Sequence, residues 1–216
     1  MKPAPSWLPD SLKVKELQTE LLATRTSIIC ALNQLLDLKD LNSGVRSMRL
    51  AEWSVRIGRD LGLDDDCLRD LEVAAIVHDI GKIGTPDAIM KKPSPLTEDE
   101  RAVMRKHPEY GWAVLKNVPG LERVSLFVLH HHEAYDGTGY PARLRGDETP
   151  IGARIVSVKD AFDAMISSRP YRKGLSIGEA IQRLQAGSGT QFDPDVTRHF
   201  IAIATDEAVG TVQELI

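Results

Sequence analysis

The sequence has little of what marks secreted or membrane proteins. Its two cysteines, Cys30 and Cys67, form no Cys-x-x-Cys pair, so it predicts neither a disulfide framework nor a thiolate zinc site. No apolar run reaches the length that spans a membrane. The stretch from Met1 to Asp10 lacks the basic-then-apolar order of a signal peptide. We therefore expect buried free thiols in a cytoplasmic protein.

Excess positive charge and strand-like alternation are also missing. The formal net charge of -4 argues against a partner that is a polymeric nucleic acid. It does not exclude a small phosphate ligand, because a metal ion and a few local Arg or Lys side chains suffice. With 216 residues, 42% of them hydrophobic, the chain is long enough for one domain with a substantial core.

Apolar residues recur at helical spacing along most of the chain, which predicts an all-α, single-domain helical bundle. The polar first half of the first helix projects from the core, so either solvent or a second copy of the chain covers it. A Gly- and Pro-rich loop is expected at 134–151, where long loops are often functional. Helices are expected at about 11–37, 48–61, 64–78, 97–107, 109–116, 121–133, 155–165, 176–184 and 195–204.

Metal-ligating side chains follow the predicted helices in an ordered series. His78-Asp79 ends the apolar run Leu71–Val77, with Gly81-Lys82 directly after it. One such pair is weak, since a lone histidine is more often structural. Here the series continues, and five of the six histidines lie within it, with His130 as a spare and His199 apart and interpreted as structural. Imidazole and carboxylate on facing helices suit a divalent transition metal. The series is His78, Asp79, His107, His131, His132 and Asp160.

These motifs together resemble the HD-GYP subfamily of the HD-domain phosphohydrolases. The likeness covers roughly residues 25 to 205, leaving 1–24 as an N-terminal extension with the start of the first helix, and 206–216 as a tail. The matching motifs are His78-Asp79-Ile80-Gly81-Lys82-Ile83-Gly84, Lys106-His107-Pro108, His131-His132-Glu133 with Asp136-Gly137-Thr138-Gly139-Tyr140-Pro141, Asp160-Ala161-Phe162-Asp163-Ala164, Ser168-Arg169-Pro170-Tyr171-Arg172 and Gly189-Thr190-Gln191-Phe192-Asp193-Pro194.

The resemblance implies a metal-dependent phosphodiesterase that hydrolyses the bacterial second messenger cyclic di-GMP, or a related cyclic dinucleotide. It implies one or two ions, iron or manganese. In that scheme Asp79 bridges two sites, His78 and Asp160 serve the first, and His107, His131 and His132 serve the second. Three further roles are implied. Lys82 meets the scissile phosphate, Arg169 and Arg172 bind the nucleotide, and Tyr140 shapes the pocket or a loop that binds a signalling protein.

One position departs from the family pattern. Arg46 stands where the family has the first histidine ligand, and Asn42 stands where trimetallic members have a carboxylate. A guanidinium group has no lone pair to offer a metal, so Arg46 predicts a weakened first site. Asn42 in place of the carboxylate predicts that no third ion binds. The alternative function is a catalytically inactive domain that acts as a cyclic di-GMP sensor or as a protein-interaction adaptor. Retention of the other ligands and of Lys82 favours the enzyme.

Overall fold

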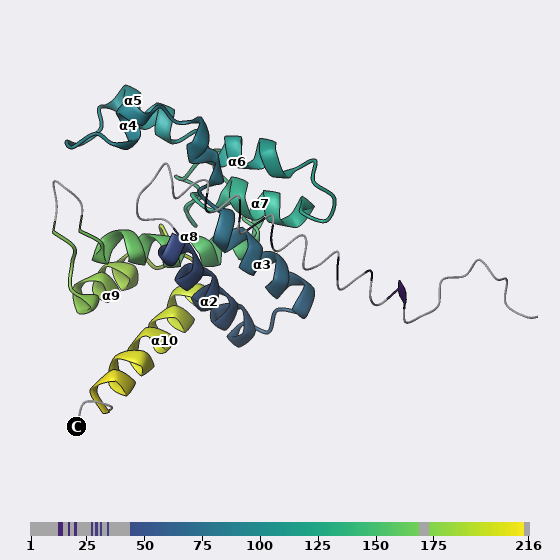
Figure 1. Ribbon diagram of the computed structural model, residues 1–216. Coiled ribbons are helices and arrows are strands. Elements are labelled where there is room, and N and C mark those ends of the chain that lie inside the picture. Colours follow the sequence, from purple (N-terminus) through teal and green to yellow (C-terminus); the bar gives the residue numbers. More distant parts are fainter. Residues whose placement is uncertain are drawn as a thin grey trace, which may run out of the picture.

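The chain folds into a bundle of helices, shown in Figure 1. The computed structural model describes residues 44–168 and 173–213, with a few isolated positions between 13 and 34; at 44–46 and 206–213 it describes the backbone alone. Within these ranges there is no β-strand, which confirms the all-α fold class. The elements are α2 (Gly44–Asp60), α3 (Asp65–Val77), η1 (Ile80–Gly84), α4 (Asp87–Met90), α5 (Glu98–Met104), α6 (His107–Leu115), α7 (Glu122–His130), η2 (Gly146–Glu148), α8 (Ile151–Ile166), α9 (Ile177–Ala186) and α10 (Pro194–Gln213).

Short polar signals set several of the helix boundaries. The Asp64 side chain accepts a hydrogen bond from the Cys67 amide at 2.7 Å and so begins α3. Thr97 begins α5 and Ser176 begins α9, each through a capping box with the Glu three residues later. Because these signals are local, they hold the starts of three helices independently of the packing between helices.

The core lies where α2, α3, α7 and α8 pack against one another. Leu50, Trp53 and Ile57 recur at helical spacing on one face of α2 and are buried. Leu71 on α3 and Ile155 on α8 are likewise fully buried. Burying one such side chain contributes about 1.5–3 kcal/mol. This packing holds the ends of α3, α7 and the following turns in a fixed relation, which is what a site built at helix ends requires.

Two details differ from the expectation. His107 begins α6 instead of ending the preceding helix, because α5 stops at Met104 and the Pro at position 108 suits the first turn of a new helix. The last helix, α10, continues to Gln213 instead of ending near Ala204, and in Figure 1 it extends away from the other helices. The predicted helix over 11–37, its proposed pairing with a second copy, and Asn42 lie outside the continuously described residues.

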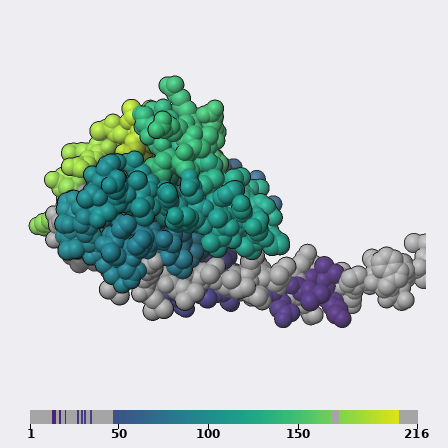
Figure 2. Space-filling view, turned by 90° about the horizontal axis from the view of Figure 1, so that it is seen from above, coloured from purple at the N-terminus to yellow at the C-terminus, as the bar shows by residue number. Residues whose placement is uncertain are grey.

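The segment from η1 to α6 forms much of one face of the molecule. In Figure 2 this segment, in teal, borders the green segment that contains the loop after α7. Contacts between α6 and η1 and between α6 and α7 join these parts. Among the described residues, no helix is long and apolar enough to cross a membrane.

Candidate metal centre

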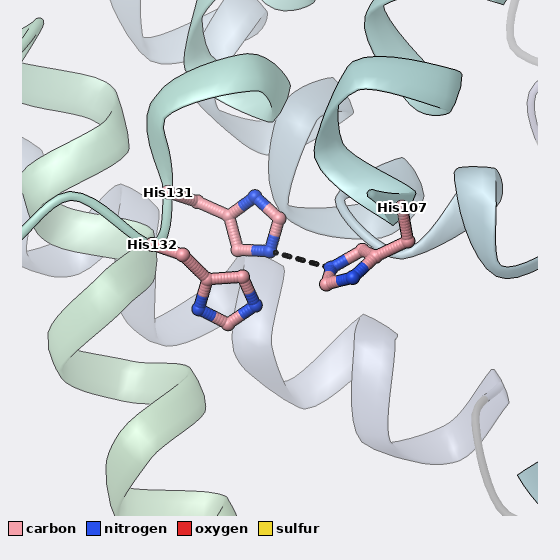
Figure 3. Close-up of side chains that lie close together, drawn as sticks. All are labelled: His107, His131 and His132. Atoms are coloured by element: carbon pink, nitrogen blue, oxygen red, sulfur yellow. Dashed lines mark hydrogen bonds between the residues drawn. The ribbon is translucent and has the colours of Figure 1, made fainter. Parts of the chain in front are cut away.

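The predicted ligands come together because each lies at or near a helix end, or faces inward from α8. The end of α3, the start of α6 and the end of α7 meet at one place, and α8 passes beside them. Figure 3 shows His107 approaching the adjacent pair His131 and His132 from a different helix. The ligand nitrogen atoms of these three residues all lie within 4.8 Å of one another. The structure also brings His78, Asp79 and Asp160 to this place.

Three of the histidine rings are held in one orientation by the same contact. The Nδ1 atom of His78, His107 and His131 lies at hydrogen-bond distance from the backbone oxygen three residues earlier. A carbonyl oxygen only accepts, so each Nδ1 donates and the Nε2 atom keeps its lone pair. A metal-ligating histidine is commonly oriented in this way. The acceptors are Ala75 O at 2.8 Å, Met104 O at 2.9 Å and Val128 O at 2.7 Å.

Two of these lone pairs face each other. The Nε2 atoms of His107 and His131 are 3.4 Å apart, as the dashed line in Figure 3 marks. Burial lowers the pKa of both rings, that of His131 well below its usual value, so neither readily holds the second proton that would make this contact a hydrogen bond. Two nitrogen atoms bound to one ion at about 2.0–2.1 Å are separated by roughly 3 Å. A shared cation therefore fits this pair.

Asp79 lies between two of the histidines. Its Oδ2 is 3.3 Å from Nε2 of His78, and its Oδ1 is 3.3 Å from Nε2 of His107. Lys82 Nζ donates to Oδ2 at 2.5 Å. Burial alone would raise the pKa of Asp79, but the charges of Lys82 and the neighbouring histidines hold it well below its usual value. The group is a carboxylate with one oxygen directed to each side.

The His78 side of the site carries an unsatisfied group. Nε2 of His78 is buried and makes no hydrogen bond of good geometry, although it lies 3.3 Å from Asp79 Oδ2 and 3.9 Å from Asp160 Oδ1. Burial lowers the pKa of His78, yet the carboxylates of Asp79 and Asp160 outweigh that effect and raise it. A buried nitrogen acceptor facing two carboxylates is a place where a cation would be stabilised. These residues therefore fit a second ion.

The loop after α7 forms a wall beside the histidines. The ring of Tyr140 stacks on that of His132, with centroids 5.0 Å apart, and the guanidinium of Arg105 lies 5.5 Å from the Tyr140 ring centroid. Burial lowers the pKa of His132 to about 3 and raises that of Tyr140, so both side chains are neutral near pH 7. A groove of about 370 Å³ opens here and is lined by all three residues.

Glu133 holds this loop in place. Its fully buried carboxylate accepts hydrogen bonds from the backbone amides of Ala142 at 2.7 Å and Leu144 at 3.2 Å. The loop is further joined to the segment after α9, where the amides of Tyr135 and Asp136 donate to backbone oxygens at 191 and 190. These hydrogen bonds therefore help to fix the positions of Tyr140 and of the groove.

Two of these residues have roles that sequence reasoning missed. Glu133 was seen as part of a motif without a function, and Arg105 was not singled out. No sequence pattern signals either residue, because each makes its contacts with residues farther along the chain. Four residues singled out from the sequence lie outside the residues and side chains that the structure describes. These are Asn42, the side chain of Arg46, Arg169 and Arg172.

Comparison with known families identifies the family of the chain. A family model described as an HD domain matches residues 30–196, most of the chain. The chain is a member of the HD domain family. The adjacent residues His78 and Asp79 carry the resemblance to the HD-GYP subfamily, and the Gly-Tyr-Pro sequence at 139–141 lies in the loop after α7.

Curated relatives of this HD domain are phosphodiesterases by name. A cyclic di-GMP phosphodiesterase response regulator of Xanthomonas campestris is 36% identical over 196 residues, which cover 86% of this chain and 52% of the relative. A cyclic di-GMP phosphodiesterase of Thermotoga maritima is 37% identical over 174 residues, covering 80% and 47%. A Vibrio cholerae protein named as 3'3'-cGAMP-specific phosphodiesterase 2 is 32% identical, covering 82% and 34%. The chain spans about half the length of the first two.

Solved structures share the fold of this HD domain. An HDG"Y"P protein from Bdellovibrio bacteriovorus has a TM-score of 0.64 at 22% identity, over 76% of this chain and 53% of that one. The HD domain of a Listeria monocytogenes phosphodiesterase, solved with cyclic-di-AMP, has a TM-score of 0.56 at 19% identity, over 80% and 94%. At these identities the likeness supports the fold alone.

Proposed function

We propose that this chain is a metal-dependent phosphodiesterase that hydrolyses a phosphodiester bond of a cyclic dinucleotide, with cyclic di-GMP as its substrate. One observation carries the proposal. Uncharged histidine nitrogens face one another around a carboxylate, Asp79, that is paired with Lys82. Relatives named as cyclic di-GMP phosphodiesterases support the choice of substrate.

The ligand roles follow from the contacts. His107, His131 and His132 would hold one ion together with Asp79, and His78 and Asp160 would hold a second that Asp79 bridges. Imidazole with carboxylate suits iron or manganese, which the family resemblance favours. Such ions lower the pKa of water and offset charge on the phosphoryl group.

The protein's own cations complete the site. Lys82 is anchored on Asp79 and 23% of its side chain stays exposed, which supports the proposal that its charge meets the scissile phosphate. Arg169 and Arg172 are proposed to bind the nucleotide's phosphates or bases. We further propose that the protein acts in cytoplasmic signalling and that the loop carrying Tyr140 contributes to binding a signalling partner.

Measurements of bound metal and of the rate of cyclic di-GMP hydrolysis test this function. The protein, loaded anaerobically with iron or manganese, is expected to hydrolyse cyclic di-GMP, and His131→Ala should lose most of its bound metal and its activity. His199→Ala is the matched control, since it removes a histidine away from the site. Equal metal in the wild type and His131→Ala by elemental analysis would refute the ligand assignment.

A second candidate function is a sensor or adaptor that binds cyclic di-GMP without cleaving it. The observation that favours it is Arg46 at a family ligand position, because guanidinium cannot coordinate a metal. Tight binding without hydrolysis by the metal-loaded wild type would select this function. In that case Arg46→His should add bound metal and raise turnover, whereas unchanged metal and turnover would show that Arg46 is not the inhibitory substitution.

A further inference from the structure

The groove beside the metal centre has a distinctive charge arrangement. Among the described residues that line its roughly 370 Å³, Arg105 is the only Arg or Lys. The lining carboxylates are already engaged. Glu133 accepts from backbone amides, and Asp136 accepts two hydrogen bonds from Thr138. Arg105 is therefore the positive charge that the described lining offers to a ligand in this groove.

Arg105 is also positioned for that purpose. It stands at the end of α5, with its guanidinium against the ring of Tyr140, which in turn stacks on His132. Tyr140 therefore contacts Arg105 and also His132 of the histidine cluster. No described carboxylate pairs with Arg105, although the nearby cation Arg101 pairs with Glu98 at 3.1 Å. A planar guanidinium stacked on an aromatic ring still presents its edge donors, which suit bidentate binding of a phosphate.

We propose that Arg105, held against Tyr140, binds the second phosphate of the cyclic dinucleotide, the one that is not being cleaved. This inference rests on the proposed function. A cyclic dinucleotide carries two phosphodiester groups on opposite sides of its ring. Lys82 and the ligand cluster serve the first, and Arg105 is joined to this cluster through Tyr140, whose ring stacks on that of His132. Arg105 is a positioning residue that sets substrate affinity and orientation and does not touch the reacting atoms.

The experiment uses the metal-loaded full chain and two substrates. Cyclic di-GMP carries a second phosphate, whereas bis(4-nitrophenyl) phosphate carries one phosphodiester alone. Arg105→Ala should raise KM for cyclic di-GMP by about tenfold, because a charge-assisted hydrogen bond is lost, while kcat changes by less than about twofold. Its kcat/KM for bis(4-nitrophenyl) phosphate should equal that of the wild type.

Two further variants separate contact from structure. Arg105→Lys keeps the charge and loses the planar fork, so its KM should lie between those of Arg105→Ala and the wild type. Arg101→Ala removes one cation from the same helix and should match the wild type. The Kd for cyclic di-GMP should also depend less steeply on salt in Arg105→Ala than in the wild type, because one phosphate contact is missing.

The outcomes distinguish this proposal from the proposed function. An unchanged KM and salt dependence in Arg105→Ala, or an equal loss on both substrates, would overturn the role of Arg105 while leaving the phosphodiesterase standing. If the wild type binds cyclic di-GMP without turnover, the calorimetric Kd and its salt dependence decide the role of Arg105. A wild type that cleaves bis(4-nitrophenyl) phosphate but neither binds nor cleaves a cyclic dinucleotide would overturn both proposals.

Discussion

Single histidines in this site do two things at once. The carbonyl groups of the last helical turn have no partner within the helix. Ala75, Met104 and Val128 belong to the last turns of α3, α5 and α7, and the histidine three residues on donates to each of them. The bond that satisfies the helix end also directs the free Nε2 inward. Helix termination and ligand orientation are therefore one feature of the sequence.

The same burial predicts how stability depends on pH in the metal-free protein. Burial lowers the pKa of His107, His131 and His132, that of His132 to about 3, whereas unfolded histidine titrates near 6.5. Below about pH 6.5 the unfolded state therefore binds more protons, and the free energy of unfolding falls as pH falls. His78, with its raised pKa, opposes this trend, but it is one group against three.

Urea unfolding of chelator-treated protein at pH 7 and pH 5 measures the effect. His132 alone should account for a loss of about 2 kcal/mol between these values. His132→Gln, which cannot titrate in this range, should show a correspondingly smaller loss. If the variant loses as much stability as the wild type, burial of His132 is not the source of the pH dependence.

Among the elements, the contact between η1 and α6 sets the distance across the metal centre. A Cβ atom added to Gly81 would lie 1.9 Å from the backbone oxygen of His107, and 2.5 Å from the amide of Gly111. These are backbone atoms, so they cannot rotate away as a side chain could. Asp79 directly precedes η1 and His107 begins α6, which is why their separation depends on this close approach.

Gly81→Ala is therefore expected to push η1 from α6, to lower the free energy of unfolding by about 2 kcal/mol or more, and to reduce bound metal. Gly178→Ala is the matched control, because a Cβ there meets nothing within 4 Å and alanine favours the α9 helix. Thermal unfolding and elemental analysis of both variants test the idea. Normal metal content in Gly81→Ala would contradict it.

Local signals were predictable from the sequence, and contacts between elements were not. The capping boxes at Thr97 and Ser176 were predictable because both partners lie within four residues. The meeting of His78 with His131 was predictable because each ends an apolar helical run. Glu133 escaped prediction because its partners lie 9 and 11 residues on, in a loop without periodicity. The contact between Arg105 and Tyr140 joins separate elements, and no sequence pattern signals it.

In the molecule as a whole, the core around α2 and α8 contains an ion pair. Lys159 is 1% exposed, and its Nζ donates to Asp163 Oδ1 at 2.5 Å, one turn along α8. The ammonium also lies 5.0 Å from the ring centroid of Trp53 on α2. The next residue, Asp160, faces the metal centre. One helix thus serves the site on one side and a charged contact in the core on the other.

Removing one partner of this pair should cost much more than removing both. Lys159→Met leaves the buried Asp163 without its cation, so the free energy of unfolding should fall by about 3–5 kcal/mol. The double variant Lys159→Met/Asp163→Leu removes the uncompensated charge as well and should recover most of that loss, because apolar side chains of similar volume often replace a buried pair without penalty.

The exposed pair of Lys91 and Asp87 provides the matched comparison, since it too joins Lys and Asp four residues apart, with side chains 57% and 59% exposed. Lys91→Met should change stability by less than about 0.5 kcal/mol. Urea unfolding of these variants, together with the single variant Asp163→Leu, gives the coupling energy between Lys159 and Asp163. If the double variant is as unstable as Lys159→Met, then Lys159 stabilises the fold through its contact with Trp53 and its packing in the core, and the charge of Asp163 is not the cause.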